Sequence, residues 1–356
     1  MRKVLVLGAG KIGGAIVDML AATGDYLVTV ADRDQAMLAR MAPGKARRRR
    51  VDVADPQALA EAAEGKDVVV SALPFFLNPA AAAAAAAAGA HYFDLTEDVA
   101  TTKAVRALAA GADTAFVPQC GLAPGFVSIV ANDLARRFET LRDVHMRVGA
   151  LPQFPVNGLK YNLTWSTDGL INEYCNPCEA IHEGRAVEVM PLEGLERFSL
   201  DGIDYEAFNT SGGLGTLCET LEGRVGSLNY KTVRYPGHRD IVKLLLEDLR
   251  LKERRPLLKD VLETAIPITH QDVVLIFVTV AGERDGRLTQ ETYAKKIYAR
   301  EIDGRLVSAI QITTAAGLCA MVDLQGQGRL PASGFVRQEQ AELGDFLANR
   351  FGRAFA

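Results

Sequence analysis

Residues 4–13 read VLVLGAGKIG, and the fold of the first half of the chain follows from them. Four apolar residues predict a short buried strand, and glycines at positions 8, 10 and 13 come directly after it and open a helix. In that context the spacing is typical of a dinucleotide-binding βαβ unit. Gly8 makes the tight turn, Gly10 lets the backbone approach a pyrophosphate, and Gly13 lets the helix pack on the strand. The N-terminus of the helix then faces the phosphate charge.

Asp32 specifies the cofactor further, because it comes 19 residues after Gly13 at the predicted end of the second strand. A carboxylate there accepts hydrogen bonds from the adenosine ribose, which favours NAD. Arg33 keeps NADP open, since an arginine beside the ribose binds a 2′-phosphate. We interpret the arginine run 47–50 as a solvated loop before the third strand. The predicted cofactor-binding residues are Gly8, Gly10, Lys11, Ile12, Gly13, Asp32, Arg33, Asp52, Val53, Ala72, Leu73 and Pro74.

The first 140 residues alternate apolar strands with helices, which predicts a parallel, doubly wound α/β sheet of the Rossmann type. Asp55 and Asn78, each followed by proline, are predicted helix N-caps. The alanine run 80–88 is predicted to be a helix with a small face that packs closely on the sheet. The predicted strands are residues 4–7, 27–31, 51–53, 67–73, 91–95 and 114–119.

The pattern changes after Phe138 and predicts a second, α+β domain with a mixed or antiparallel sheet. Turns at 283–286 and 303–304 indicate hairpins. The predicted strands are 141–148, 229–235, 272–280, 293–300 and 306–312, and the predicted helices are 166–174, 240–249 and 257–264. We expect a cofactor-binding domain at 1–123, a substrate-binding and dimerisation domain at 124–312, and a segment at 313–356 that returns to the first domain.

Composition excludes several classes of protein. A net charge of -4 gives no support to nucleic-acid binding. The longest uncharged stretch, 68–93, is interrupted by Ser71 and Pro74, so we expect no membrane span, and the apolar run at the N-terminus is too short for a secretory signal. Five cysteines, an odd and sparse set, predict reduced thiols in the cytoplasm. The lone pair Cys175 and Cys178 lacks further soft ligands, so no metal site is expected.

Four stretches together resemble the saccharopine dehydrogenase-like oxidoreductases: GAGKIG at 8–13, DVVVSALPF at 67–75, HYFDLTED at 91–98 and CGLAPG at 120–125. KYNLTWS at 160–166, TSGG at 210–213 and YKTVRYPGH at 230–238 bring the chain nearest to the lysine 6-dehydrogenase branch of that family. The resemblance implies a Rossmann domain, a substrate domain inserted after the GxxPG turn, and a returning C-terminal segment that starts near Thr313.

The resemblance also implies an activity. Enzymes of that branch use NAD to oxidise the terminal amine of L-lysine, and the 6-semialdehyde product cyclises to piperideine-6-carboxylate. A chain of 356 residues favours a lysine-sized substrate over the larger saccharopine. Two alternatives stay open: a reductase that joins an amine to a semialdehyde, as saccharopine and carboxynorspermidine enzymes do, or a non-catalytic NAD-sensing protein. We expect a homodimer or larger oligomer, because the long sheet of the second domain has edges to cover and similar enzymes oligomerise.

Amine oxidation requires the ammonium, with a pKa of about 10.4, to lose its proton, so a base or a desolvating pocket is needed. Asp94 ends the fifth strand at the edge where ligands bind, and we nominate it for amine binding or proton transfer, with a helix N-cap as the alternative. Cys120 borders the same edge, with a small core residue as the alternative. His238 starts a helix and is either a cap or a proton relay.

Arg234 is the predicted grip on the substrate α-carboxylate, because guanidinium suits bidentate binding. Lys231 is a second candidate, although a regular strand puts it on the face opposite Arg234. By the resemblance, Tyr161, Asn162 and Trp165 line the substrate pocket; a core aromatic is the alternative for Trp165.

Overall fold

The computed structural model describes residues 1–41, 44–302 and 304–356. Within these ranges the chain folds into two compact units. The first unit comprises Met1–Phe126 and Gln311–Ala356, and the second comprises Val127–Ile310. These bounds lie within a few residues of the boundaries that the sequence suggests.

The first unit is built on one parallel sheet of seven strands, in the order β17-β6-β5-β4-β1-β2-β3. The order reverses between β1 and β4, which is the point where doubly wound sheets bind their ligands. The predicted fold class is therefore confirmed for this unit. The strands are β1 (Arg2–Leu7), β2 (Tyr26–Asp32), β3 (Arg47–Arg50), β4 (Val68–Ser71), β5 (His91–Asp94), β6 (Ala115–Val117) and β17 (Gly334–Phe335).

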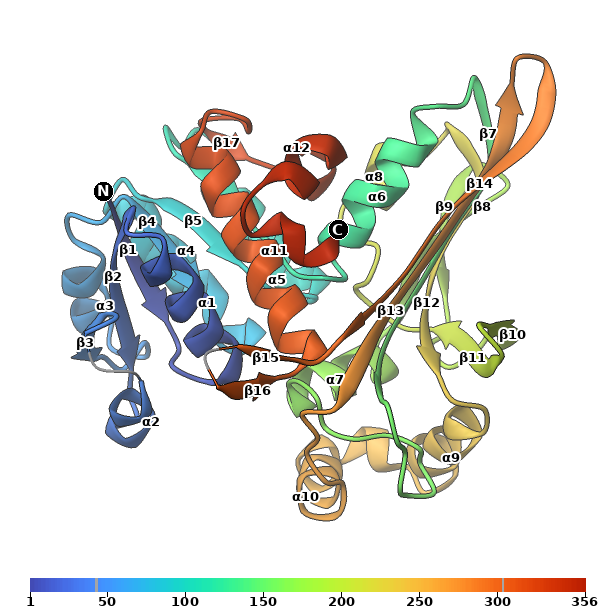
Figure 1. Ribbon diagram of the computed structural model, residues 1–356, viewed down its shortest axis with the longest axis horizontal. Helices are drawn as coiled ribbons and strands as arrows, with labels where there is room; N and C mark the ends of the chain where they lie inside the picture. The colour runs from blue at the N-terminus through green and yellow to red at the C-terminus, as the bar shows by residue number, and fades with distance from the viewer. Residues whose placement is uncertain (42–43, 303) are drawn as a thin grey trace. The chain divides into compact units, whose positions relative to one another are not determined.

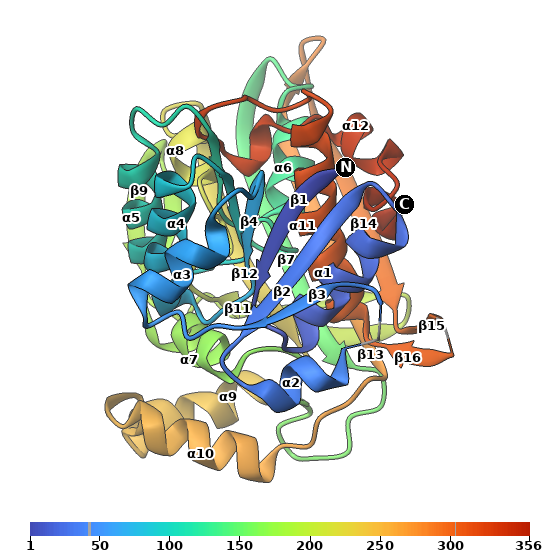
Figure 2. The same cartoon turned by 90° about the vertical axis from the view of Figure 1, so that its left-hand side faces the viewer.

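Helices cover both faces of this sheet. α3, α4 and α5 pack side by side on one face, and α1 contacts α11 on the other (Figure 2). The buried alanines of α4, Ala81, Ala82 and Ala85, join the core cluster formed with strand residues of β4 and β5, as the small face of the run predicts. The helices are α1 (Lys11–Ala22), α2 (Gln35–Arg40), α3 (Pro56–Ala63), α4 (Asn78–Ala87), α5 (Val99–Ala109), α11 (Ala309–Gly326) and α12 (Leu343–Ala348).

Two predictions for this unit are wrong. The arginine run is itself the third strand, because Asp32 pairs with Arg50 along a parallel ladder, and Val51 and Val53 follow it into the core. A strand at the sheet edge needs only its backbone for pairing, and long charged side chains protect the open edge from association. Asn78 is not a cap either: it lies inside α4, and its side-chain oxygen accepts a hydrogen bond from Ser71 Oγ at 2.7 Å.

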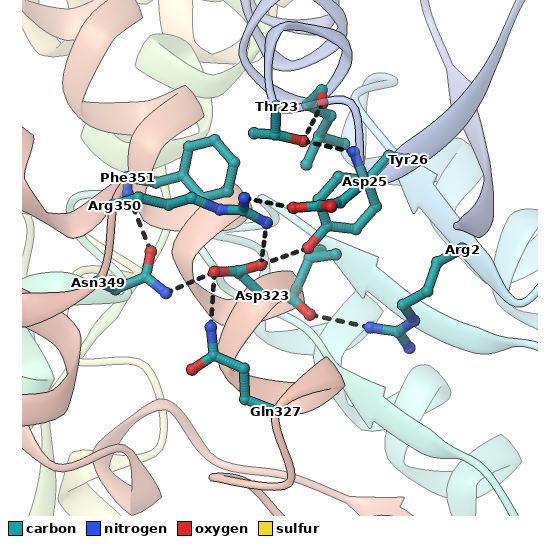
Figure 3. A network of polar contacts seen from close by, with 11 residues as sticks. Arg2, Thr23, Asp25, Tyr26, Asp323, Gln327, Asn349, Arg350 and Phe351 are labelled. Carbon is teal, nitrogen blue, oxygen red and sulfur yellow. Dashed lines mark hydrogen bonds and ion pairs between the residues drawn. The ribbon is translucent and has the colours of Figure 1, made fainter.

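The C-terminal segment is tied to the start of the chain by buried polar contacts (Figure 3). The Asp323 carboxylate of α11 accepts hydrogen bonds from the Tyr26 hydroxyl at 2.6 Å and from Asn349 at 2.8 Å. Arg350 pairs with both Asp323 and Asp25, at 2.7 and 2.5 Å. The segment therefore completes the first unit, as the resemblance implies.

The second unit holds a mixed sheet of eight strands, which confirms the predicted class. The path is β10-β11-β12-β7-β13-β14, and β8 pairs with β12 and β9. β7 and β12 are parallel, whereas β13 and β14 form a long hairpin (orange in Figure 1) that closes through the predicted turn at Asp285 and Gly286, both with positive φ. The strands are β7 (Thr140–Pro152), β8 (Cys178–His182), β9 (Arg185–Val189), β10 (Glu196–Leu200), β11 (Ile203–Asn209), β12 (Val225–Arg234), β13 (Asp272–Arg284) and β14 (Arg287–Tyr298).

The helices of this unit are α6 (Phe126–Ala135), α7 (Thr167–Cys175), α8 (Leu217–Leu221), α9 (His238–Lys243) and α10 (Arg255–Ala265). The predicted strand at 306–312 is wrong. Only a short strand, β16 (Arg305–Val307), pairs with β15 (Arg300–Ile302), and α11 begins at Ala309 because the Asp272 carboxylate accepts hydrogen bonds from the backbone N–H groups of Ala309 and Ile310. The predicted turn residue Asp303 lies outside the described residues. No helix in the described ranges is long and apolar enough to cross a membrane.

Candidate active site

The glycine loop between β1 and α1 has the geometry of a pyrophosphate cradle. Gly8 has φ 99°, and a Cβ on it would lie 2.7 Å from the carbonyl oxygen of Ala72. A Cβ on Gly13 would lie 1.9 Å from the carbonyl oxygen of Gly8, so α1 approaches β1 only with glycine there. Gly10 is the N-cap, no side chain caps the helix, and a Cβ on Gly10 would meet no described atom within 4 Å. The uncapped N–H groups of Lys11, Ile12 and Gly13 therefore suit a bound phosphate.

Asp32 lies beside this loop at the end of β2. Its carboxylate accepts hydrogen bonds from the backbone N–H groups of Ala9 at 2.7 Å and Asp34 at 2.8 Å. Arg50 is paired with Asp32 across the ladder, and its Nε donates to the carbonyl oxygen of Arg33 at 3.2 Å. The predicted ribose site therefore has one fixed carboxylate with two arginines beside it.

The remaining predicted cofactor residues follow the neighbouring strands. Ala72 extends the pairing of β4, because its N–H donates to the Leu7 carbonyl oxygen at 2.8 Å, and Leu73 and Pro74 come after it. Asp52 makes a local turn by accepting from the Ala54 N–H, and Val53 is buried. Register puts these residues at the same carboxyl edge of the sheet as the glycine loop.

Asp94 is held by the loops around it, and its nomination for amine binding or proton transfer stays a prediction. The side chain is fully buried and accepts three hydrogen bonds, from the backbone N–H groups of Thr96 and Gln119 and from the Tyr92 hydroxyl, at 3.0, 2.9 and 2.9 Å. Burial raises the pKa of this carboxyl to about 6, although the three donors oppose the rise. The carboxylate thus fixes the loops after β5 and β6. The N-cap of α5 is Asp98, which accepts from the Thr101 N–H at 2.7 Å.

Cys120 is enclosed in the core of the first unit. Its thiol is buried and donates to the Val117 carbonyl oxygen at 3.0 Å, and Gln338 Nε2 lies 3.2 Å from the sulfur. Burial raises the pKa of the Cys120 thiol well above its ordinary value. A neutral, enclosed thiol is a poor nucleophile, which favours the core-residue alternative, and the catalytic nomination of Cys120 stays a prediction.

Arg234 is one of several buried charged residues of the second unit. It ends β12, is 2% exposed, and lies over the rings of Tyr161 and Tyr174, with the guanidinium carbon 4.9 and 5.8 Å from their centroids. Its Nε donates to the Tyr174 hydroxyl at 2.9 Å and its Nη1 to the Val233 carbonyl oxygen at 2.8 Å. A buried guanidinium costs much free energy unless an anion or strong acceptors accompany it. The buried Glu173 is one such anion, because its negative charge acts on Arg234 and stabilises the charged guanidinium.

His238 lies next to Arg234, at the start of α9 as the sequence predicts. Its Nδ1 is 2.7 Å from the Leu159 carbonyl oxygen and its Nε2 is 3.0 Å from the Tyr174 hydroxyl. Burial and the neighbouring Arg234 lower the pKa of His238 to about 3. The ring is therefore neutral near pH 7 with both nitrogens engaged, and the nomination of His238 as a proton relay stays a prediction.

Lys231 lies on the opposite face of the sheet from Arg234, as strand alternation predicts. Its ammonium group binds the Glu196 carboxylate, which also forms two hydrogen bonds of 2.7 Å with Arg147. Leu151, Tyr205 and Val233 form the hydrophobic cluster on that face, whereas Arg234 faces the cluster that includes Tyr161 and Phe208. Lys231 is thus an ion-pair partner of Glu196 in this structure, and its substrate-binding role stays a prediction.

Buried polar atoms without a partner lie on the Arg234 face. Among the described side chains, Asn162 Oδ1 and Thr210 Oγ1 are buried and have no hydrogen-bond partner, whereas the Tyr161 hydroxyl lies close enough to Thr164 and Trp165 to interact with both. Asn162 Nδ2 donates to the Pro267 carbonyl oxygen at 3.1 Å, which leaves Oδ1 as an unused acceptor. Trp165 is half-buried and packs against the same cluster. Unsatisfied buried polar atoms are rare in folded proteins, so they indicate a polar ligand or bound water.

Sequence reasoning missed Tyr174, Thr164 and Thr210. Tyr174 lies in α7, and only the folded chain brings it to Arg234 at the end of β12, whereas Thr210 follows β11 and lies farther back along β12, beyond the pair of Asn209 and Lys231. The one available signal was that Thr164 and Thr210 belong to the motifs at 160–166 and 210–213.

Among the residues with described positions, no group of three or more His, Cys, Asp or Glu is arranged to hold a metal ion. Cys175 and Cys178 are free thiols, and burial raises the pKa of both, that of Cys178 to about 12.

Comparison with known proteins gives two family matches that cover both units. Residues 4–117 match the saccharopine dehydrogenase NADP binding domain, and residues 121–349 match the saccharopine dehydrogenase C-terminal domain. The saccharopine dehydrogenase [NADP(+), L-glutamate-forming] of Saccharomyces cerevisiae is 27% identical over 275 residues, which are 71% of this chain and 59% of the yeast protein. The chain thus spans less than two thirds of that relative.

A solved structure shows the same fold. The apo, histidine-tagged saccharopine dehydrogenase (L-Glu forming) from Saccharomyces cerevisiae superposes with a TM-score of 0.78 at 18% identity, over 95% of this chain and 94% of that one. The first unit, with its glycine loop and Asp32, is accordingly a nicotinamide-dinucleotide-binding domain. The chain belongs to the saccharopine dehydrogenase family.

Proposed function

We propose that this protein is an NAD(P)-dependent oxidoreductase that oxidises the terminal amine of an amino acid, with L-lysine as the favoured substrate. The product is the 6-semialdehyde, which cyclises to piperideine-6-carboxylate. One observation carries the proposal: the buried Arg234 shares its face of the second unit with Asn162, whose Oδ1 has no partner among the described residues, and the buried Glu173 is the carboxylate whose charge acts on it. An anionic ligand with further polar groups suits that face, and an α-amino acid carries a carboxylate for Arg234.

The chemistry divides between the units. The cofactor, held at the glycine loop and Asp32, supplies a nicotinamide ring that accepts hydride. The neutral amine R–CH2–NH2 gives up hydride from carbon and becomes the iminium R–CH=NH2⁺. Water then adds to the iminium, and ammonium leaves with formation of the aldehyde. Arg234 is the proposed partner of the substrate carboxylate, and binding energy at that group contributes to ordering the substrate.

NAD is the proposed cofactor, with NADP as the alternative. The Asp32 carboxylate repels a 2′-phosphate, whereas Arg33 and Arg50 attract one. The family match to an NADP binding domain supports keeping both cofactors in the test.

A saccharopine-type reductase is the second candidate, and the yeast relative supports it. That reaction joins an amine to a semialdehyde and reduces the resulting imine, so it needs the same hydride transfer at a carbon–nitrogen bond. A larger substrate with more than one carboxylate would require anion sites in addition to Arg234.

The deciding experiment mixes the purified protein with NAD or NADP and with L-lysine, saccharopine, carboxynorspermidine or cadaverine, and follows absorbance of the reduced nicotinamide. We expect reduced cofactor with L-lysine and little with cadaverine, which lacks a carboxylate. Turnover of saccharopine or carboxynorspermidine but not lysine would favour the second candidate. Cofactor binding without any turnover would favour the NAD-sensing alternative.

We also propose that the protein acts in the cytoplasm as a homodimer or larger oligomer. Its five cysteines are free thiols, in accord with a reducing compartment. In the described part of the chain, β14 pairs only with β13, so the second unit presents a long sheet edge.

A further inference from the structure

We infer that Tyr174 and His238 are positioning residues, whose hydrogen bonds run in one direction and hold the Arg234 guanidinium in a single orientation for a carboxylate. The inference rests on the proposed role of Arg234 in carboxylate binding. Neither residue is assigned a contact with the reacting atoms.

Three hydrogen bonds link Leu159, His238, Tyr174 and Arg234 in series. Their directions follow from the groups at the two ends of the series, the Leu159 carbonyl oxygen and Arg234 Nε. The Leu159 carbonyl oxygen can only accept, so His238 Nδ1, 2.7 Å away, carries the hydrogen. The other ring nitrogen, Nε2, is then an acceptor and receives the Tyr174 hydroxyl hydrogen across 3.0 Å. The Tyr174 oxygen is left with its lone pairs toward Arg234 Nε, which can only donate, at 2.9 Å. One tautomer and one hydroxyl rotamer satisfy all three contacts.

The fold holds both His238 and Tyr174 in place. Glu206 accepts hydrogen bonds from the backbone N–H groups of Gly237 and Arg239, at 2.9 and 2.7 Å, and so anchors the turn that presents His238. The Tyr161 ring packs edge-on against His238, with centroids 5.3 Å apart, and also lies under the guanidinium of Arg234. Tyr174 is held within α7, whose N-cap is Ser166.

This arrangement determines which side of the guanidinium receives a ligand. Nε is occupied by Tyr174, and one Nη1 hydrogen is occupied by Val233. The second Nη1 hydrogen and those of Nη2 form the remaining edge. A carboxylate therefore binds end-on, through both terminal nitrogens, rather than through Nε. A rotated guanidinium would lose that paired contact.

The test uses Tyr174→Phe, which removes only the hydroxyl, alone and together with Arg234→Lys. Trp165 is the only tryptophan and packs beside Tyr161, so its fluorescence reports ligand binding without turnover. The ligands are L-lysine and cadaverine. We expect Tyr174→Phe to weaken L-lysine binding about tenfold or more, because it removes a hydrogen bond to a charged group, and to leave cadaverine binding unchanged. In the Arg234→Lys background, Tyr174→Phe should add little, because it acts through Arg234.

Tyr205→Phe is the matched control, because Tyr205 is equally buried but lies in the cluster on the opposite face of the sheet. It should bind both ligands normally. His238→Ala leaves the Tyr174 hydroxyl without its acceptor and should reproduce the Tyr174→Phe defect without adding to it. Equal losses for L-lysine and cadaverine, or an undiminished further loss in the Arg234→Lys background, would overturn the inference.

A measurement without ligand separates this inference from the proposed function. Nitrogen-15 NMR of the wild-type protein should show His238 as the neutral Nδ1–H tautomer and a slowly exchanging Arg234 Nε–H. Exchange of that hydrogen should become about ten times faster in Tyr174→Phe. If exchange is unchanged, Tyr174 does not hold Arg234. If exchange changes as expected but no amine is oxidised, the proposed function fails and the positioning role stands.

Discussion

Asp94 and Arg234 are both buried charged residues, but their surroundings differ, and we expect them to differ in role. The Asp94 carboxylate has three donors in the first unit, so its free energy cost of burial is offset by the fold itself. Arg234 has two hydrogen bonds in the described chain, and unused polar atoms share its face. A satisfied buried charge indicates structure, whereas an incompletely satisfied cluster indicates a ligand.

This distinction predicts the behaviour of two Asp94 variants. Asp94→Asn keeps an oxygen for the Thr96 and Gln119 N–H groups and an amide to donate to Tyr92, so kcat/KM should stay within about threefold of wild type. Asp94→Ala leaves two buried N–H groups without an acceptor and should lower the free energy of unfolding by about 2 kcal/mol. Steady-state kinetics measure kcat/KM of Asp94→Asn, and denaturant unfolding measures the stability of Asp94→Ala. A large loss of kcat in a stable Asp94→Asn protein would place Asp94 among the catalytic residues.

We expect Asp32 to determine the choice between NAD and NADP. Asp32→Ala removes an acceptor for the ribose hydroxyls and the repulsion of a 2′-phosphate, while Arg33 and Arg50 remain. Binding of NAD should therefore weaken more than binding of NADP, which titration of each reduced cofactor by its fluorescence measures. Equal losses for the two cofactors would show that Asp32 does not contact the ribose.

At the scale of elements, sequence alone identifies what is periodic and local. The βαβ start, the turn at Asp285 and Gly286, and the opposite faces of Lys231 and Arg234 all follow from spacing. The strand made of four arginines, β3, could not be predicted from spacing, because it forms by backbone pairing with β2. The contact between Tyr174 and His238 joins α7 to α9 across 64 positions, and no local pattern encodes such a contact.

The close packing of α1 on β1 predicts contrasting effects for adjacent glycines. Gly13→Ala places a methyl group 1.9 Å from the Gly8 carbonyl oxygen, which must displace the loop, so both cofactor affinity and stability should fall. Gly14→Ala meets only Met41 Sδ at 3.7 Å, an ordinary contact, and alanine favours a helix by up to about 1 kcal/mol. Thermal unfolding of Gly13→Ala and Gly14→Ala, with and without NAD, compares the stability and the cofactor binding of the two variants. Equal behaviour of the two variants would contradict the tight helix–strand contact.

At the scale of the whole molecule, the family matches extend across both units, and the C-terminal segment belongs to the first. The chain thus leaves the cofactor-binding unit, forms the second unit, and returns. The exposed edge of β14 predicts association through the second unit. Light scattering over a wide range of protein concentrations should give the mass of a dimer or larger oligomer, and a monomer mass at every concentration would exclude that expectation.

The proposal that Arg234 holds the substrate carboxylate during amine oxidation is tested most directly by the steady-state kinetics of Arg234→Lys with L-lysine and NAD. Lysine keeps the charge but not the planar fork, so kcat/KM should fall by about one to two orders of magnitude, in line with about 1.5–3 kcal/mol for a charge-assisted hydrogen bond. The affinity for NAD should not change. Normal turnover by Arg234→Lys, or no oxidation of L-lysine by the wild-type protein, would contradict the account.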